Sequence, residues 1–131
     1  MADLENLPLR DWHPVSQLRA ASTVVTRTAK PAIDVHNHLG RWLTDGGDWM
    51  IDDVPALVAL MDECGIATIV NLDGMWGDEV TANVDRYDRA FPGRFLTFCQ
   101  LDWTLIDDPG ALTASLDDSA ARGARGLKVW K

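Results

Sequence analysis

The chain has 131 residues, of which 47% are hydrophobic and 24% are charged, as expected for one globular domain with its own core. Its formal net charge of −8 argues against binding to nucleic acid or to an anionic membrane surface. No apolar run approaches the length of a membrane span, and no apolar signal region opens the sequence. The two cysteines, Cys64 and Cys99, are expected to be buried thiols of a cytoplasmic protein.

The first thirty residues show no periodic spacing of apolar side chains. Pro8 and Pro14 interrupt the segment around Trp12 too closely for a helix. We therefore expect residues 1–30 to form an arm that packs on the rest of the chain or on another subunit. His13 lies in this arm and is expected to be a surface or capping residue.

From residue 31 onward, apolar runs alternate with segments of helical spacing. The apolar runs predict strands at residues 32–36, 66–72, 95–101 and from 126 on. Apolar side chains at helical spacing predict helices at residues 54–64, 78–91 and 109–122. The first and third helices share an aspartate cap (Asp52 or Asp53, and Asp108), a proline in the first turn and a glycine after the last turn (Gly65 and Gly123).

The order β-α-β-α-β-α-β implies an α/β fold with a parallel sheet and right-handed crossovers. An open doubly wound sheet and the (β/α)8 barrel both use this order, but no Gly-x-Gly-x-x-Gly follows the first strand to favour a dinucleotide-binding sheet. A complete barrel needs about 250 residues. We therefore expect residues 31–131 to form the first half of a TIM-like barrel, ending after its fourth strand. The predicted strands end in polar residues, as at the catalytic face of a barrel: His36 and His38, Asn71 and Asp73, Gln100 and Asp102, and Lys128 or Lys131.

The histidine pair at the end of the first strand, His36 and His38, is the most informative feature of the sequence. Residues i and i+2 of a strand project to the same side, so both imidazoles are expected to point one way. Two converging neutral imidazoles make half of a site for zinc or a similar divalent ion. Asp34 falls on the same face and could orient a ligand or approach the metal. A chance pair on a solvated strand is the alternative interpretation.

The segment Ile33-Asp34-Val35-His36-Asn37-His38-Leu39-Gly40 resembles the opening strand of the amidohydrolase superfamily. The resemblance is closest to the amidohydrolase-related branch, which also contains metal-dependent decarboxylases. Residues 123–131 resemble the fourth strand of that branch, and residues 8–14 are similar to a segment of some members. Members fold as (β/α)8 barrels that hold one or two divalent metals, usually zinc. The resemblance implies that His36 and His38 are metal ligands, whereas the family's other ligands come from later strands that are not in this sequence.

The resemblance also implies a function, the hydrolysis of an amide, ester or lactone-type bond of a small molecule by metal-activated water. The alternatives are a metal-dependent decarboxylase of the same family, and a non-catalytic half barrel that self-associates through open sheet edges. Because the later-strand ligands are missing, we expect the isolated chain to have little or no activity. No catalytic residue can be assigned from the sequence.

For several other residues near the predicted site, the sequence allows both a functional and a purely structural role. In binuclear members of the family a lysine at the end of the fourth strand is carbamylated and bridges the metals. Lys128 or Lys131 could be that residue, or could lie in solvent. Arg41 could bind an anionic substrate or remain a solvated loop charge. The loop tryptophans could line an apolar pocket or pack loops onto the rim of the sheet: Trp42, Trp49, Trp76 and Trp103.

Overall fold

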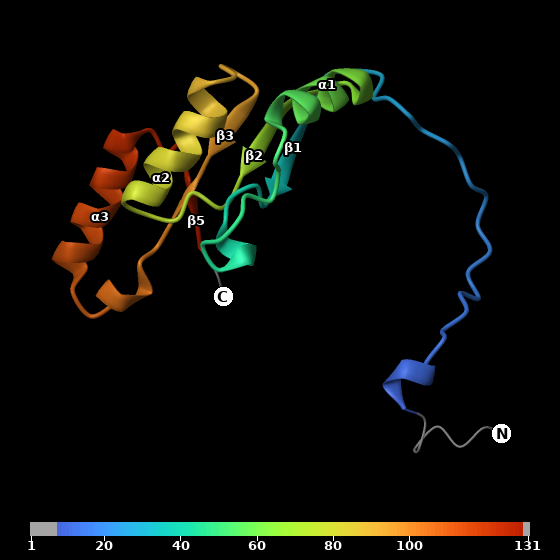
Figure 1. Cartoon of the computed structure of the whole chain (residues 1–131), viewed down its shortest axis with the longest axis horizontal. Coiled ribbons are helices and arrows are strands. Elements are labelled where there is room, and N and C mark those ends of the chain that lie inside the picture. The colour runs from blue at the N-terminus through green and yellow to red at the C-terminus, as the bar shows by residue number, and fades with distance from the viewer. Residues whose placement is uncertain (1–7, 130–131) are drawn as a thin grey trace.

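The computed structural model describes residues 8–129 and shows a mixed α/β fold with parallel strands (Figure 1). The prediction of parallel β/α repeats is confirmed at this level. The strands are β1 (Ala32–Asn37), β2 (Ile66–Asn71), β3 (Phe95–Thr97), β4 (Cys99–Gln100) and β5 (Leu127–Lys128). The helices are α1 (Val54–Cys64), α2 (Asp78–Asn83) and α3 (Pro109–Arg122), with a π-helical segment, η4 (Val84–Arg89), directly after α2.

The helices α1 and α3 begin and end where the sequence predicts. The carboxylate of Asp53 accepts a hydrogen bond from the backbone N–H of Ala56, and Asp108 caps α3 in the same way through Ala111. Gly65 and Gly123 follow these helices in the left-handed backbone region that glycine adopts without strain. Local chemistry therefore sets the bounds of both helices.

Two predicted elements are divided in the structure. Residues 78–91 were expected to form one helix, but the α-helical part stops at Asn83 and the chain continues as η4. Residues 95–101 were expected to form one strand, but β3 pairs with β2 and β4 pairs with β5. The backbone N–H of Phe98, between β3 and β4, donates to the carbonyl of Asn71 at the end of β2. The carbonyl of Thr97 already accepts from the backbone N–H of Arg125, just before β5. The chain therefore changes its pairing partner at Phe98.

The strands are parallel, in the order β1-β2-β3 in one sheet and β4-β5 in the other. Asp34 lies opposite Ile69 and Asn37 lies opposite Asn71, so β1 has one residue more than β2 between these pairs. This irregularity of β1 begins just before the histidine pair. It changes how the end of the strand presents its side chains.

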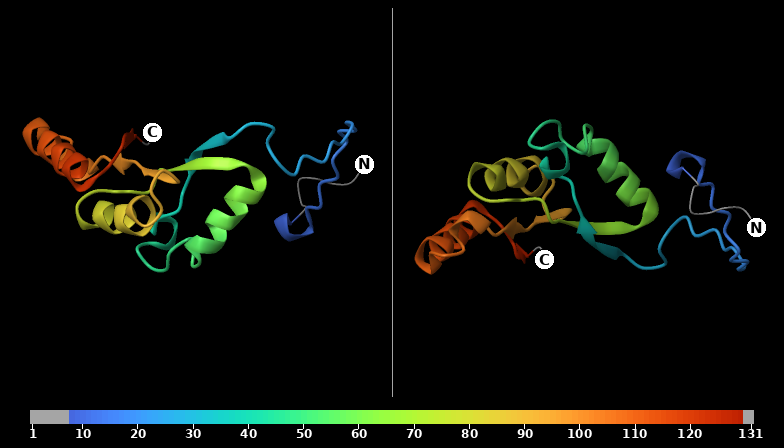
Figure 2. Two further views of the ribbon diagram at one scale, coloured as in Figure 1. Left: turned by 90° about the horizontal axis from the view of Figure 1, so that it is seen from above. Right: turned by 90° about the horizontal axis from the view of Figure 1, so that it is seen from below.

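The core lies between the β1-β2-β3 sheet and the helical segments α1 and η4, which cover the same side of it (Figure 2). Its buried members are Leu39, Val54, Met61, Ile69, Tyr87 and Phe95. A second cluster (Val80, Val84 and Cys99) packs against Leu116 of α3. No helix within residues 8–129 is both long and apolar enough to cross a membrane.

The apolar run before the histidine pair is typical of a buried parallel strand, and this interpretation is wrong for two of its side chains. Ile33 is 60% exposed and Val35 is 67% exposed. Within the described part of the chain, β1 pairs only with β2, so its other edge has no neighbouring strand. An apolar run in the sequence predicts a buried strand, but it does not show which neighbouring strands and helices are present to cover that strand.

The arm predicted for residues 1–30 is described from residue 8 on and extends away from the helices and sheets (Figure 1). It begins with a short 3-10 turn at Leu9–Asp11, and its side chains are largely exposed. It meets the rest of the chain at the end of α1. There the Arg27 guanidinium donates to the backbone carbonyls of Asp62 and Glu63, and Thr28 donates to that of Gly65.

Candidate functional site

The two predicted ligands, His36 and His38, lie side by side at the carboxyl end of β1. The centroids of their rings are 5.5 Å apart. His36 is exposed, whereas the His38 side chain is only 19% exposed. The structure therefore brings the pair together, with one ring in solvent and one set against the protein.

His38 has a carboxylate partner just beyond the neighbouring strand, β2. Its Nδ1 lies 2.6 Å from Oδ1 of Asp73, whose side chain is fully buried just beyond β2. A carboxylate at this distance favours a proton on Nδ1 and leaves the lone pair of the neutral ring on Nε2. This contact fixes both the tautomer and the ring orientation, as carboxylates bonded to the far nitrogen do for metal-binding histidines.

Asp73 is held in place by Asn71, the last residue of β2. The side-chain oxygen of Asn71 accepts from the backbone N–H groups of Asp73 and Leu39, at 3.2 and 3.0 Å. One amide therefore ties the chain after β1 to the chain after β2. The second carboxylate oxygen of Asp73, Oδ2, is buried and has no hydrogen-bond partner among residues 8–129. A buried carboxylate with one unpaired oxygen thus lies directly behind His38.

Gly40 allows this close approach of the two strand ends. A Cβ atom at position 40 would lie 2.6 Å from Cβ of Asp73 and 2.8 Å from its carbonyl oxygen. Any larger residue would therefore push Asp73 away from His38. The sequence marks Gly40 only as a glycine after the histidine pair.

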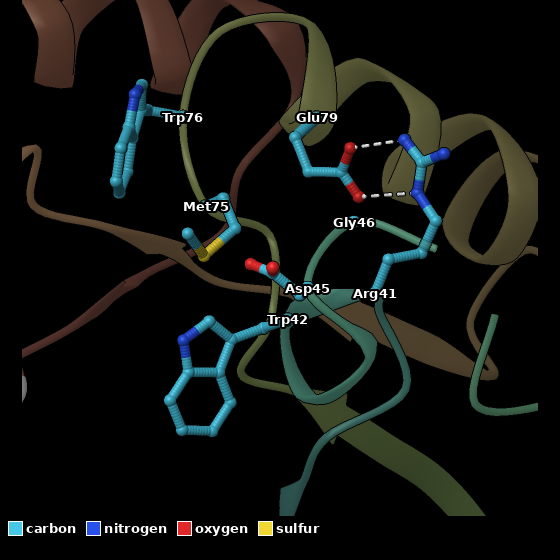
Figure 3. A pocket seen from close by; sticks show the side chains of 7 residues that line it. All are labelled: Arg41, Trp42, Asp45, Gly46, Met75, Trp76 and Glu79. Carbon is cyan, nitrogen blue, oxygen red and sulfur yellow. Dashed lines mark hydrogen bonds and ion pairs between the residues drawn. The ribbon is translucent and has the colours of Figure 1, made fainter. Parts of the chain in front are cut away.

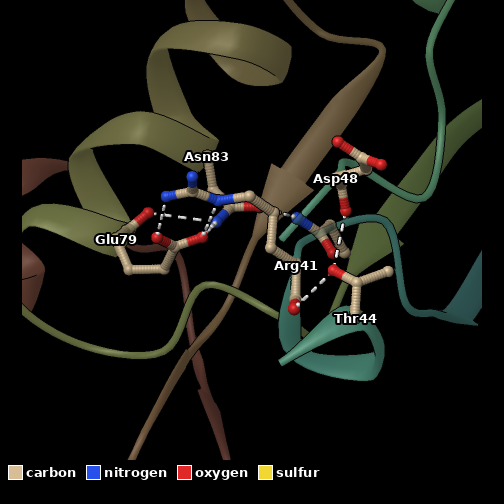
Figure 4. A network of polar contacts seen from close by, with 6 residues as sticks. Arg41, Thr44, Asp48, Glu79 and Asn83 are labelled. Atoms are coloured by element: carbon tan, nitrogen blue, oxygen red, sulfur yellow. Dashed lines mark hydrogen bonds and ion pairs between the residues drawn. The ribbon is translucent and has the colours of Figure 1, made fainter. Parts of the chain in front are cut away.

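A polar network extends from Asn71 to the surface, and Figure 4 shows its part around Asn83, Glu79 and Arg41. The Asn71 side chain donates to Asn83, whose amide donates to the backbone carbonyl and the carboxylate of Glu79. Glu79 in turn accepts two hydrogen bonds from Arg41, at 3.1 and 2.5 Å. The loop after β1 is thereby connected to α2. Sequence reasoning assigned no role to Asn83 or Glu79.

Arg41 is engaged on several sides. The hydrogen bond and the charge of Glu79 raise the pKa of Arg41, so the guanidinium stays charged. Its guanidinium carbon also lies 4.9 Å from the centre of the Trp49 ring. The predicted binding of an anionic substrate would have to compete with a bidentate carboxylate already in place.

A cavity of about 280 Å³ opens between the loop after β1 and the start of α2 (Figure 3). Its walls include Trp42, Met75 and Trp76, with Asp45 and the Arg41–Glu79 pair as polar groups. The Trp42 ring is 5.7 Å from that of His38, so this wall of the cavity lies next to one histidine of the pair. Two of the four tryptophans predicted to line a pocket therefore do so, while Trp49 packs on the core residue Tyr87 and Trp103 is 47% exposed.

Other polar strand ends have different roles. Gln100 donates to the backbone carbonyl of Leu72, and Asp102 caps a 3-10 turn through Thr104. The Asp34 carboxylate accepts from the backbone N–H of His36, so the carboxylate bonded to an imidazole is that of Asp73 and not Asp34. Lys128 is half-buried in β5 opposite Gln100, and Lys131 lies outside the described residues.

Within residues 8–129, no three His, Cys, Asp or Glu side chains lie together so that they could hold a metal ion. In the described part of the chain, the predicted metal site therefore consists of the His36 and His38 rings alone. No protein-family model matches the sequence, and comparisons with curated proteins and with solved structures found no significant match. The resemblance to the amidohydrolase-related branch stays a prediction.

Proposed function

We propose that this chain is the N-terminal part of a metal-dependent, amidohydrolase-like hydrolase, built as the first half of a (β/α)8 barrel. In this proposal His36 and His38 bind a divalent ion, with zinc as the expected metal. The observation that carries the proposal is the contact of 2.6 Å between His38 and the buried Asp73. A solvated chance pair of histidines has no need of such a partner.

The residues present fit a metal ligand set of this kind. Asp73 orients the neutral tautomer of His38, and its charge makes the ring a stronger donor to a cation. His36 stands beside it with its ring exposed, 5.5 Å away between centroids. Two imidazoles are fewer than the three protein ligands usual in catalytic zinc sites. The remaining ligands in this proposal are water, substrate or groups outside the described residues.

A bound divalent ion would supply a Lewis acid that polarises a substrate oxygen and activates water for attack on an amide, ester or lactone. The protein contributes the orientation of the two imidazoles and an apolar cavity beside them. Hydrolysis is favoured over decarboxylation because Arg41, the cation nearest the cavity, is paired with Glu79. A carboxylate substrate would find no unpaired cation among the residues that line the cavity.

The proposal is tested by titrating the chelator-treated protein with zinc in a calorimeter. We compare the wild type with His36→Ala, His38→Ala and the control His13→Ala, which changes an exposed histidine of the arm. Either ligand variant is expected to bind zinc at least about tenfold more weakly, while the control is unchanged. Equal zinc affinity in all four proteins would remove the ligand assignment.

Catalysis is a separate expectation. With only two protein ligands in the described residues, we expect no metal-dependent turnover of chromogenic esters or anilides by this chain alone. Turnover that is abolished by chelation and by His36→Ala would contradict this expectation of inactivity while supporting the assignment of the ligand.

A further inference from the structure

The cavity beside the histidines has a composition that selects a class of ligand. Trp42 and Trp76 present indole rings to it, and Met75 lies between them (Figure 3). Its volume of about 280 Å³ is at the lower end of small-molecule sites, enough for one compact group. The shape and the apolar walls of the cavity do not distinguish neutral, cationic and anionic groups. The charges of the lining side chains therefore determine which of these groups binds.

The charges around the cavity leave a net negative group. Glu79 and Arg41 neutralise each other through two hydrogen bonds. Asp45 also lines the cavity, and none of the ion pairs found in residues 8–129 includes it. The carboxylate of Asp45 is therefore the uncompensated charge at this site.

The position of Asp45 is set by the backbone. It ends the 3-10 turn Trp42–Thr44 in the left-handed conformation, with φ of 55°, and its N–H donates to the carbonyl of Trp42. Aspartate and asparagine adopt this conformation more readily than other residues with side chains. The same turn thus fixes an indole and a carboxylate on one side of the cavity. Trp76 lies on the opposite side in Figure 3.

We propose that this cavity binds a compact organic cation, such as a trialkylammonium group. Indole faces attract such a cation through the ring quadrupole, and Asp45 adds an opposite charge. Carboxylate ligands are disfavoured because the one cationic side chain in the lining is already paired. The Trp42 ring adjoins that of His38, so the bound cation would lie close to the proposed metal ligands. That this cation is part of the substrate rests on the proposed function.

Three probes of nearly equal shape test the charge preference. They are choline as the cation, 3,3-dimethylbutan-1-ol as its neutral carbon analogue, and 3,3-dimethylbutanoate as the anion. Binding to the full chain is measured by calorimetry in the presence of a chelator. The indole N–H signals in NMR spectra, assigned with Trp42→Leu and Trp76→Leu, locate the bound ligand. We expect choline to bind about tenfold more tightly than the neutral analogue, and the anion to bind most weakly.

The variant Asp45→Asn keeps a residue that tolerates the left-handed backbone and removes the charge. We expect it to lose most of the preference for choline over the neutral analogue. Asp48→Asn removes the same charge from the same exposed loop, outside the cavity lining, and is expected to keep the preference. The proposal is overturned if no probe binds, if the neutral analogue binds as tightly as choline, or if both variants behave alike.

Because the probes bind without metal, this result and the zinc titration are independent. Selective choline binding without zinc affinity would support the proposed cation site and contradict the proposed metal-dependent hydrolase. Zinc affinity that depends on His36 and His38, without selective choline binding, would do the reverse.

Discussion

Nδ1 of His38 lies 2.6 Å from Oδ1 of Asp73, although 35 positions separate them in the sequence. They meet because β1 and β2 are parallel neighbours, so the segments that follow the two strands emerge at the same edge. The backbone N–H of Leu72 also bonds to the carbonyl of Asn37, at 2.8 Å. The orientation of His38 is thus fixed by the pairing of two strands.

The first prediction concerns the charge of Asp73. Asp73→Asn keeps the size of the side chain but removes the negative charge behind His38, and its amide no longer requires the Nδ1-protonated tautomer. We expect zinc affinity to fall about 10–100-fold, as when other groups that hydrogen-bond to a metal ligand are removed. Titration calorimetry measures the affinity, and nitrogen NMR shifts of His38 report the tautomer.

The control for this variant is Asp34→Asn, which removes the same charge from an exposed residue of β1. Its carboxylate bonds to the backbone of His36 and not to a ring. We expect its zinc affinity and the His38 tautomer to match the wild type. An equal loss in both variants would show a general effect of charge and would remove the specific role of Asp73.

The second prediction concerns Gly40. In Gly40→Ala the new methyl group would lie 2.6 Å from Cβ of Asp73, so the two strand ends must separate. We expect a loss of about 1–3 kcal/mol in the free energy of unfolding, as for other overpacked sites. Urea unfolding measures it. Gly110→Ala, near the start of α3, provides a control, because its nearest neighbour would be the Asp108 carboxylate at 3.3 Å. Wild-type stability in Gly40→Ala would refute the close contact.

The third prediction concerns Tyr87, the single tyrosine of the chain. Its hydroxyl donates to the carbonyl of Leu39, at 2.7 Å, and burial raises the pKa of Tyr87 above its ordinary value of 10.0. The folded chain therefore holds the phenol proton more tightly than the unfolded chain. The stability that this proton contributes is complete below about pH 10 and falls as the pH rises through the folded pKa.

Ultraviolet absorbance of tyrosinate measures this titration directly, because no other tyrosine contributes. We expect a midpoint above 10.0 in the folded protein, shifting down in urea. Tyr87→Phe should be destabilised at neutral pH by about 1–3 kcal/mol, because the Leu39 carbonyl loses its donor. It should also show a smaller decrease in stability with alkaline pH. An ordinary midpoint in the folded protein would contradict the burial of this ring.

The fourth prediction concerns the unpaired edge of β1. We expect two copies of the chain to associate there, because an edge strand with exposed Ile33 and Val35 presents backbone groups and apolar surface together. Val35→Lys should shift the chain to monomers in sedimentation velocity experiments over a range of concentrations. Val24→Lys introduces the same charge at an exposed site of the arm, and we expect it to leave the association of the chain unchanged. A wild type that stays monomeric throughout would contradict this prediction.

The sequence predicted the elements whose bounds depend on local chemistry. The caps Asp53 and Asp108 and the glycines after each helix define α1 and α3 correctly. It did not predict the change from α2 to η4, because the buried Val80, Val84 and Tyr87 fit a continuous helix equally well. The division of the third strand at Phe98 depends on which strands lie on each side, and that is decided by tertiary structure.

The site was predicted only in its local part. The spacing of His36 and His38 was sufficient to place their rings together. The orienting carboxylate was sought at Asp34 within the same strand, but it comes from Asp73 beyond the neighbouring strand. Asp73 was recognised as a polar strand end, and the parallel order of β1 and β2 is the signal that could have paired it with His38. The burial of Asp73 and the pairing of Arg41 with Glu79 depend on contacts across the fold.

In our proposal the imidazoles of His36 and His38 hold one metal ion, and the X-ray absorption spectrum of the zinc-loaded chain reports these ligands. We predict scattering from two imidazole ligands in the wild type and in His13→Ala, and from one in His36→Ala or His38→Ala. A spectrum without imidazole scattering, or one that is the same in all four proteins, would contradict the proposal.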